Sequence, residues 1–325
     1  MNYIQQAYKG KNDWYYWCFT ILLVFFGWQI LGGVPLLFAA FMHSDNIEEF
    51  MAAGSDNFMS LGMDKNLFLF LIIFTFALGL IFLFIGIKYI HKRTITSLVT
   101  SRSKIDWKRF WVGFFTWGVL VVVLTFVGIL MEPEIYKYNF NAKPFFILVT
   151  ISLLFLPLQT SLEELLFRGY FMQGIGILAK NRWVPLLVTS VCFGLLHGAN
   201  PEVQKLGYTM MIFYIGTGFL YGITTLMDEG TELALGLHAA NNVLAAFLVT
   251  TDWMVFQTDA LYIDISEPAI SLAMFLPVFT LYPLMIWFFS KKYRWTNWIE
   301  KLTGKIEKPL NFKENYRVLE DLSAE

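Results

Sequence analysis

The repeated apolar segments of this chain constrain its fold more than any other feature. A run of about 20 apolar residues can cross the roughly 30 Å hydrocarbon core of a bilayer as a helix. Of the residues, 57% are hydrophobic and only 15% are charged, whereas about a quarter are charged in soluble domains. Because a backbone in lipid must satisfy its own hydrogen bonds, the sequence predicts an all-α, polytopic membrane helical bundle with about eight transmembrane helices. They are predicted over residues 14–42, 67–90, 110–131, 144–166, 183–197, 208–227, 233–249 and 269–289.

These helices divide the chain into four predicted regions. Residues 1–143 hold three N-terminal transmembrane helices, and residues 144–250 hold a core of four helices. Residues 251–290 hold an outer loop and the last transmembrane helix. Residues 291–325 form a cytoplasmic tail that is amphipathic in part and otherwise loose, especially over 311–325.

Two of the predicted helices are expected to be unusual. The first contains Gly32, Gly33 and Pro35, which predict a kink or an early end. In the tail, apolar residues recur among lysines with a spacing that suits a short amphipathic helix at the inner membrane interface. These apolar residues are Trp295, Trp298, Ile299, Leu302 and Ile306. The favoured alternative is a solvated basic tail with no function beyond anchoring.

The lysines and arginines are distributed unevenly over the loops. With the N-terminus inside, nineteen of the 24 lie on the inner side, and Arg168 lies within the membrane. Because positively charged loops stay in the cytoplasm, both termini are predicted to be cytoplasmic, and we expect a bacterial plasma membrane. The inner loop 228–232 is acidic, but acidic residues weigh little in this rule. No nucleic-acid partner is expected; the bilayer is the expected surroundings.

The stretch SLEELLFRGY, residues 161–170, places charges inside an apolar run. Such charges are costly in a membrane, so they usually face the protein interior and serve a function. Glu164 and Arg168 are four residues apart and can pair along one helix face. Glu163 lies about 100° round the helix from Glu164, which leaves it for a group on another helix. An equally weighted alternative is a charge cluster at a helix end that interfacial water stabilises.

Two of the four histidines also lie in apolar runs. His43 and His91 lie at segment ends, where water is expected to satisfy them, whereas His197 and His238 lie within segments. Glu163 is seventeen residues before Lys180 in a polar turn, and His197 is seventeen residues after it. If both arms are helical, each lies about 25 Å from the turn, so Glu163 and His197 face each other at one level.

The seventh predicted helix adds further polar groups. His238 and Asn242 are four residues apart and share a face, and Asn241 lies close to that face. His238 lies only about 10 Å from the inner end of its helix, whereas Glu163 lies deeper. Therefore either the region 169–182 projects past the membrane or lies along it, or the helices are strongly tilted.

These groups permit acyl transfer to water. A carboxylate beside an imidazole can take a proton from water, and a second imidazole with an amide can donate hydrogen bonds to the oxyanion that forms. Ser161 and Cys192 are nearby in the sequence, but neither has a base beside it. A hydrolase in which water is the nucleophile is the simplest chemical interpretation.

Three patterns now stand in order: Glu163-Glu164-x-x-x-Arg168, Phe193-x-x-x-His197 and His238-x-x-x-Asn242. Together they resemble the CPBP family of intramembrane proteases, which joins type II CAAX prenyl endopeptidases to the Abi proteins of bacteriocin processing and self-immunity. The resemblance covers about residues 144–249, so 144–250 would be the catalytic core.

The resemblance also implies roles for single residues. Glu163 and His197 would activate the attacking water, and His238 and Asn242 would form the oxyanion hole. Three residues would support the site: Glu164 and Arg168 as a pair, and Phe193 by packing; Asn241 is a further supporting candidate. The family is glutamate-dependent, so no cofactor is expected, and the substrate would be a membrane-associated peptide or protein.

Two alternatives remain open. The first is a zinc-dependent, metalloendopeptidase-like membrane hydrolase with Glu163, His197 and His238 as ligands, because two histidines and a carboxylate form a known catalytic zinc set. The second is a non-catalytic membrane binding or immunity protein, or a proton-coupled transporter that uses the same buried ionisable groups.

Overall fold

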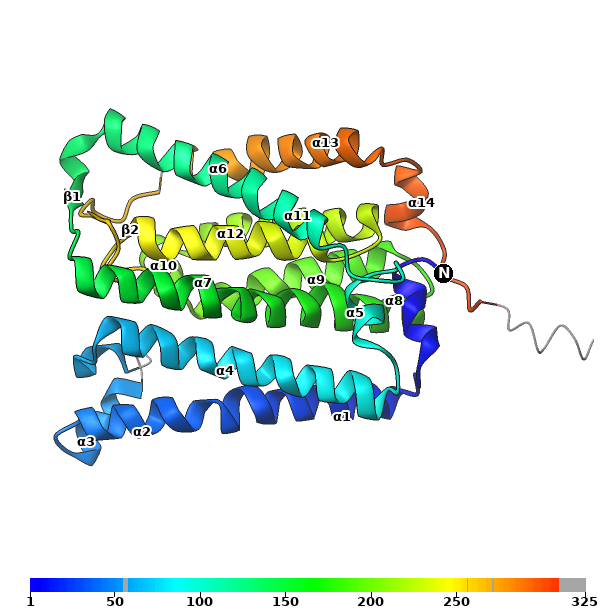
Figure 1. Ribbon diagram of the computed structural model, residues 1–325, viewed down its shortest axis with the longest axis horizontal. Coiled ribbons are helices and arrows are strands. Elements are labelled where there is room, and N and C mark those ends of the chain that lie inside the picture. The colour runs from blue at the N-terminus through cyan, green and yellow to red at the C-terminus, as the bar shows by residue number, and fades with distance from the viewer. Residues whose placement is uncertain (55–57, 256, 271, 310–325) are drawn as a thin grey trace, which may run out of the picture.

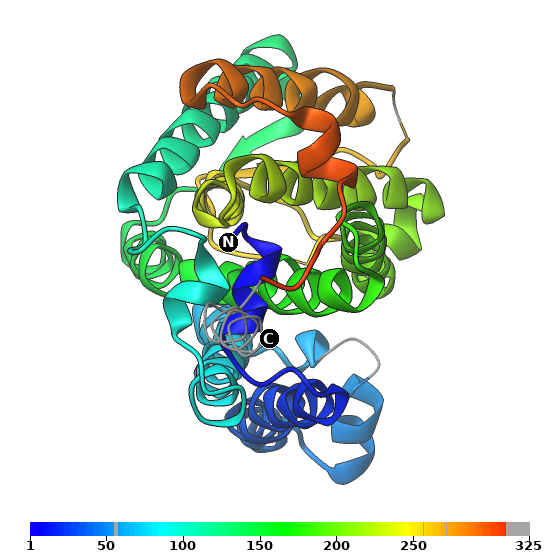
Figure 2. The ribbon, with the colours of Figure 1, turned by 90° about the vertical axis from the view of Figure 1, so that its right-hand side faces the viewer.

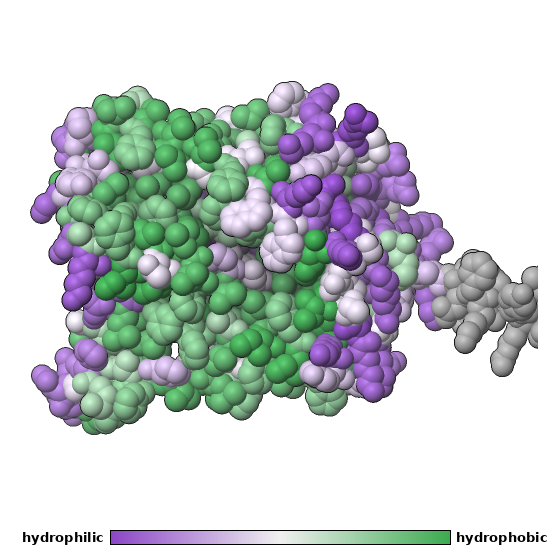
Figure 3. Space-filling view, viewed as in Figure 1, coloured by the Kyte–Doolittle hydropathy of each residue, from purple (hydrophilic) through white to green (hydrophobic). Residues whose placement is uncertain are grey.

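A computed structural model describes residues 1–54, 58–255, 257–270 and 272–309 of the chain. Its helices run side by side along one long axis (Figure 1). The surface has a broad apolar middle between two polar ends (Figure 3), as expected of a protein that spans a bilayer. The predicted fold class, an all-α bundle in a membrane, is confirmed.

Five helices of the described residues are long and apolar enough to cross a membrane. They cover Trp14–His43, Lys65–Ile90, Trp107–Met131, Ala142–Ala179 and Tyr208–Asp228. Two shorter apolar helices cover Trp183–Ala199 and Glu232–Leu248. The eighth predicted crossing, 269–289, is a succession of a 3₁₀ turn, a π-helix and α13 instead of one regular helix.

The N-terminal half begins with the 3₁₀ helix Ile4–Lys9, and most of its long helices contain a π-helical stretch. The kink predicted near Gly32 is a π-helix, Phe26–Leu31, inside an otherwise continuous helix. The elements are α1 (Trp14–Phe25), α2 (Gly33–His43), α3 (Ile47–Ala53), α4 (Lys65–Ile85) with the π-helix Gly86–Ile90, α5 (Ile95–Val99) and α6 (Trp107–Met131).

The second half holds the helices that carry the site. They are α7 (Ala142–Glu164), the π-helix Leu165–Phe171, α8 (Met172–Ala179), α9 (Trp183–Leu196), α10 (Pro201–Leu206), α11 (Met211–Asp228), α12 (Glu232–Leu248), α13 (Tyr282–Tyr293) and α14 (Trp298–Thr303). Single 3₁₀ turns lie at Met59–Leu61, Pro133–Ile135, His197–Ala199, Tyr208–Met210 and Leu272–Phe275, and a last π-helix at Pro277–Leu281. Three short strands, β1 (Tyr136–Tyr138), β2 (Val249–Thr250) and β3 (Tyr262–Asp264), form a small sheet in the order β1-β3-β2. This sheet was not predicted.

The helix α12 is largely enclosed by its neighbours. Seen end-on (Figure 2), it lies among α6, α7 and α11, while α1 and α4 form a layer along the other side of α7. Every residue from 231 to 240 is buried. The side chains of α7 and α12 therefore meet away from lipid.

The helix that begins at Ala142 continues to Ala179 through the π-helix Leu165–Phe171. Its 38 residues extend about 57 Å at 1.5 Å per residue, nearly twice the hydrocarbon thickness. How the region 169–182 lies relative to the membrane therefore stays a prediction. Its glycines serve close packing: a Cβ on Gly174 would lie 2.8 Å from the ring of Trp17.

The N-terminus and the last described residues lie at the same end of the bundle, called the basal end from this point on. Gln5 Nε2 donates to the carbonyl of Glu307 at 2.9 Å. The tail up to residue 309 packs on the bundle, because Trp295 and Ile306 are buried. These two residues were predicted on an amphipathic interfacial helix, and that prediction was wrong for them; between Arg294 and residue 309 the described helix is Trp298–Thr303. The predicted loose stretch 311–325 lies outside the described residues.

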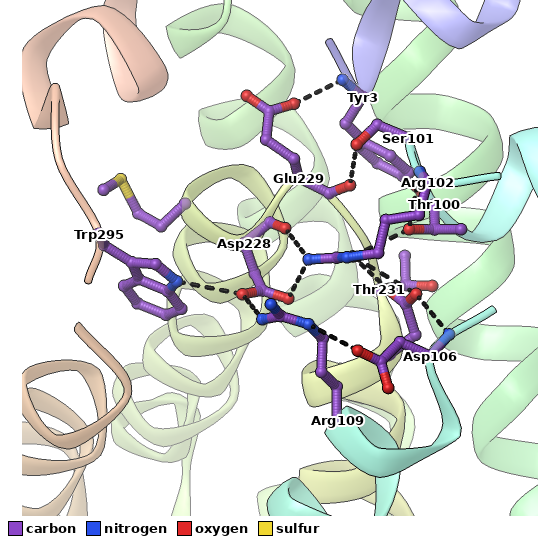
Figure 4. Close-up of polar contacts among 12 residues, drawn as sticks. Tyr3, Thr100, Ser101, Arg102, Asp106, Arg109, Asp228, Glu229, Thr231 and Trp295 are labelled. Atoms are coloured by element: carbon purple, nitrogen blue, oxygen red, sulfur yellow. Dashed lines mark hydrogen bonds and ion pairs between the residues drawn. The ribbon is translucent and has the colours of Figure 1, made fainter. Parts of the chain in front are cut away.

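Arginines and acidic residues form an ion network at the basal end (Figure 4). Asp228 pairs with Arg102 and Arg109, and it accepts a hydrogen bond from Trp295 Nε1 at 3.1 Å. Glu232 also pairs with Arg102, at 3.2 Å. The network thus joins the loop before α6, the turn between α11 and α12, and the segment before α14.

His91 also differs from the expectation that water satisfies it. Its ring is fully buried, with Nδ1 2.8 Å from the carbonyl oxygen of Lys11 and Nε2 2.9 Å from the hydroxyl of Tyr170. Burial lowers the pKa of His91 to about 4, so its imidazole is neutral at pH 7.

Candidate active site

The predicted pair of Glu164 and Arg168 is present and fully buried. Arg168 Nη1 lies 3.1 Å from Glu164 Oε1, and Nη2 donates to the carbonyl of Gly218 on α11 at 3.0 Å. The guanidinium also lies 4.2 Å from the ring centroid of Phe193. The charge of Arg168 is thus compensated by a carboxylate, a carbonyl and an aromatic face, which makes its burial tolerable.

His238 lies between the two adjacent glutamates. Its Nδ1 lies 2.9 Å from Glu164 Oε1, and its Nε2 lies 3.4 Å from Glu163 Oε2. The ring of Tyr221 stacks on the imidazole at a centroid distance of 5.0 Å. Glu164 therefore orients the ring and leaves Nε2 directed at Glu163, at a distance slightly too long for a hydrogen bond.

Glu163 has a partner on its own helix that was not predicted. Gln159 Nε2 donates to Glu163 Oε1 at 2.6 Å, and Gln159 Oε1 accepts a hydrogen bond from Asn242 Nδ2 at 3.0 Å. Gln159 thereby joins the carboxylate on α7 to the amide on α12. The available sequence signal was its position four residues before Glu163 in an apolar run.

Asn241 supports Asn242 from the α6 side. Asn241 Nδ2 donates to Asn242 Oδ1 at 3.2 Å, and Asn241 Oδ1 accepts from Trp117 Nε1 at 3.2 Å. Trp117, on α6, was not predicted as a site residue. Hydrogen bonds therefore run without a break from α6 through α12 to Glu163.

His197 faces the same cavity as Glu163. The cavity has a volume of about 160 Å³, enough for several water molecules, and Asn200 and Phe193 also line it. His197 Nδ1 lies 2.8 Å from the carbonyl oxygen of Phe193, so Nδ1 donates and Nε2 remains available. Glu163 and His197, which the hairpin spacing predicted at one level, therefore line one cavity.

Phe193 and Tyr214 hold the ring of His197. Phe193 contacts both imidazoles, with centroid distances of 4.8 Å to His197 and 5.9 Å to His238. Tyr214, on α11, stacks on His197 at 4.5 Å. Phe193 was predicted as a packing residue, whereas Tyr214 was missed because nothing in its apolar segment marks it.

The zinc alternative does not fit this arrangement. Within the described part of the chain, no group of three or more His, Cys, Asp or Glu side chains is placed to hold a metal ion. Glu163 and His238 are close, and the ring of Phe193 contacts both His238 and His197. The three proposed ligands therefore do not converge on one point.

Comparison with known proteins agrees with these motifs. Residues 142–244, which contain all the site residues named above on α7, α9, α11 and α12, match the sequence model of a family described as "Type II CAAX prenyl endopeptidase Rce1-like". The chain is 31% identical over 252 residues to YyaK of Bacillus subtilis (strain 168), described as an uncharacterized protein. This alignment covers 77% of the chain and 83% of YyaK. No solved structure matches the chain.

Proposed function

Because this chain belongs to the Rce1-like family of type II CAAX prenyl endopeptidases, we propose that it is an intramembrane glutamate-type endopeptidase. It would hydrolyse a peptide bond of a membrane-associated peptide or protein. One observation carries this proposal: Glu163 and His197 line one cavity that has room for water. No cofactor takes part in the proposed reaction.

In the proposed reaction, Glu163 and His197 Nε2 hold a water molecule in the cavity. Glu163 takes a proton from this water while the water oxygen bonds to the carbonyl carbon of the scissile peptide. The carbonyl oxygen becomes an oxyanion. Glu163 then gives its proton to the leaving nitrogen as the carbon–nitrogen bond breaks.

His238 and Asn242 are proposed as the donors to that oxyanion. Glu164 accepts from Nδ1 of His238, so a proton on Nε2 makes the ring a cation between two carboxylates. Asn242 Nδ2 donates to Gln159 before the reaction and would exchange this acceptor for the oxyanion. Glu164, Arg168 and Asn241 would keep these donors in place.

The surroundings of the cavity support a substrate that arrives through lipid. An apolar groove of about 540 Å³ lies beside the cavity, between α1, α9 and the π-helix after α7. Trp28, Leu166, Phe167 and Leu196 line both the groove and the cavity. An apolar segment or a lipid chain of the substrate would fit in this groove, with its peptide bond in the cavity.

Loss of cleavage in a near-isosteric variant tests the proposal. The purified protein in liposomes is given two quenched fluorescent peptides. One ends in a farnesylated cysteine followed by three residues, and the other contains a transmembrane apolar segment. Membranes of the source cells are added in parallel, and new peptide termini are mapped by mass spectrometry. Glu163→Gln and His197→Ala should each lose at least about 100-fold in cleavage rate while remaining folded.

The matched control is Glu48→Gln, since Glu48 is exposed on α3, a helix that holds none of the site residues. It should cleave at the wild-type rate. Wild-type cleavage by Glu163→Gln would contradict the proposal. The protein is a binding or transport protein instead if two results are found together. Neither probe nor any membrane peptide is cleaved, and Glu163→Gln restores to cells that lack the protein whatever property they lost with it.

A further inference from the structure

A second carboxylate outside the three motifs is buried beside the cavity. Glu202, at the start of α10, is 1% exposed. No lysine, arginine or histidine of the described residues forms an ion pair with it. Burying polar oxygens without hydrogen-bond partners is costly, so neighbouring donors must satisfy the carboxyl group of Glu202.

Three donors do so, and two of them lead to His197. Glu202 Oε1 accepts from the hydroxyl of Tyr214 and from Asn200 Nδ2, the latter at 3.0 Å. Glu202 Oε2 accepts from the backbone N–H of Val255 at 3.2 Å. Asn200 also lines the cavity that Glu163 and His197 share.

Tyr214 and Asn200 both contact His197. The planes of the Tyr214 and His197 rings differ by only 19°, so the two rings stack face to face. The backbone N–H of Asn200 donates to the carbonyl of His197 at 3.0 Å. Phe193 contacts the same imidazole. The imidazole is thus fixed in its plane by Tyr214, and Tyr214 is fixed by Glu202.

We propose that Glu202 is a positioning residue that acts through Tyr214 and Asn200 to keep Nε2 of His197 directed at the water beside Glu163. This inference rests on the proposed function for its kinetic consequence, but the placement of His197 can be tested without any activity. The hydroxyl of Tyr214 is the link, and its ring is the surface that holds the imidazole.

The kinetic experiment uses the full-length protein in liposomes with whichever of the two quenched peptides the wild type cleaves. Glu202→Ala should lower kcat roughly 10- to 100-fold and leave KM within about twofold, because it misplaces a catalytic group without touching the substrate. Glu202→Gln keeps an oxygen acceptor for Tyr214 and should stay within about threefold of wild type. Tyr214→Phe, which keeps the ring stack, should lie between the two.

A double-mutant cycle separates positioning from general damage. In a His197→Gln background, Glu202→Ala should cause less than about a twofold further loss in kcat, since two residues that act as a unit are not additive. If Glu202→Ala lowers kcat as much in this background as in the wild type, the proposal is overturned.

The activity-independent experiment follows modification of His197 by diethyl pyrocarbonate, mapped by mass spectrometry. Without the ring stack the imidazole is freer and more accessible, so Glu202→Ala and Tyr214→Leu should be modified at least about twice as fast as wild type. His43, which is exposed on α2, serves as the internal reference, and Glu48→Ala is the control variant.

The kinetic and the modification experiments together distinguish the positioning role of Glu202 from the proposed protease activity. If His197 is modified faster in both variants while the wild type cleaves neither probe nor any membrane peptide, the placement of His197 by Glu202 is supported and the proposed protease is not. Unchanged modification in both variants overturns the positioning role, whatever the protease activity is.

Discussion

At the scale of single residues, Gln159 links the proposed catalytic base to one proposed oxyanion donor. It is the one side chain of the described residues that hydrogen bonds to both Glu163 and Asn242. In the proposed reaction these two groups act on opposite sides of the scissile carbonyl, one on the water and the other on the oxygen. Gln159 therefore sets the distance between the base and one oxyanion donor.

Replacing Gln159 by leucine should separate these two groups. Gln159→Leu keeps a similar volume at a position that is 8% exposed, but removes both hydrogen bonds. We expect kcat to fall roughly 10- to 100-fold with little change in KM, because displacement of catalytic groups by about 1 Å costs this much. Gln204→Leu, an exposed position on α10, is the control. A kcat equal to that of the control would show that Gln159 has no part in placing Glu163.

The spacing of residues along one helix predicts contacts within that helix, but it does not predict contacts between helices. Glu164 and Arg168 were predicted to pair because both lie on the same helix, four residues apart. The same rule in the other direction would have found Gln159, a neutral hydrogen-bond donor to Glu163 on the same helix. Tyr214 and Tyr221 were beyond such rules, because their contacts with His197 and His238 depend on how α11 packs.

At the scale of elements, the position of His238 and Asn242 depends on how closely α12 approaches α6. Two glycines allow this approach. A Cβ on Gly236 would overlap the carbonyl oxygen of Phe110, and a Cβ on Gly113 would lie 2.5 Å from the carbonyl oxygen of Leu233. Small residues at such crossings let helix backbones come together in membranes. Because Gly236 is two residues before His238, any shift of α12 is passed directly to the site.

Gly236→Ala should therefore push α12 away from α6. We expect a loss of about 1–3 kcal/mol in the free energy of unfolding, the usual cost of overpacking, with a large loss of peptide cleavage. Titration with a denaturing detergent, followed by circular dichroism, measures the stability. Gly33→Ala is the matched control, since a Cβ there meets nothing within 4 Å and its stability should change by less than about 0.5 kcal/mol. Equal stability of the two variants would refute the role of Gly236.

The elements themselves were predictable to different degrees. Helices of around 20 apolar residues were found because the bilayer imposes their length. The π-helix Leu165–Phe171, which contains Arg168, was not, because one extra residue in a turn leaves no mark on composition. The strands β1, β2 and β3 have only two or three residues each, too few for an alternating pattern to show.

At the scale of the whole molecule, the ion network of the basal end pairs several of the arginines that were counted in the prediction of orientation. Arg102, Arg109 and Arg182 were counted as inner positive charges in the prediction of orientation, yet each pairs with an acidic residue of 228–232. Figure 4 shows the pairs of Arg102 and Arg109 with Asp228. The lysines at this end, such as Lys104, remain exposed. The count of lysines and arginines that predicts the orientation is unchanged, because acidic residues weigh little in that rule.

Labelling from the two sides of the membrane tests the orientation that follows. We expect the basal end in the cytoplasm, because positively charged loops are retained there and both described chain ends lie at it. Single cysteines are placed at Lys104 and Lys137, on opposite ends of α6, after Cys18 and Cys192 are changed to serine. In intact cells, a membrane-impermeant maleimide should label Lys137→Cys and not Lys104→Cys, and permeabilised cells should show both. The reverse pattern would place the termini outside, because an exposed lysine at each end reports directly which polar face meets the medium.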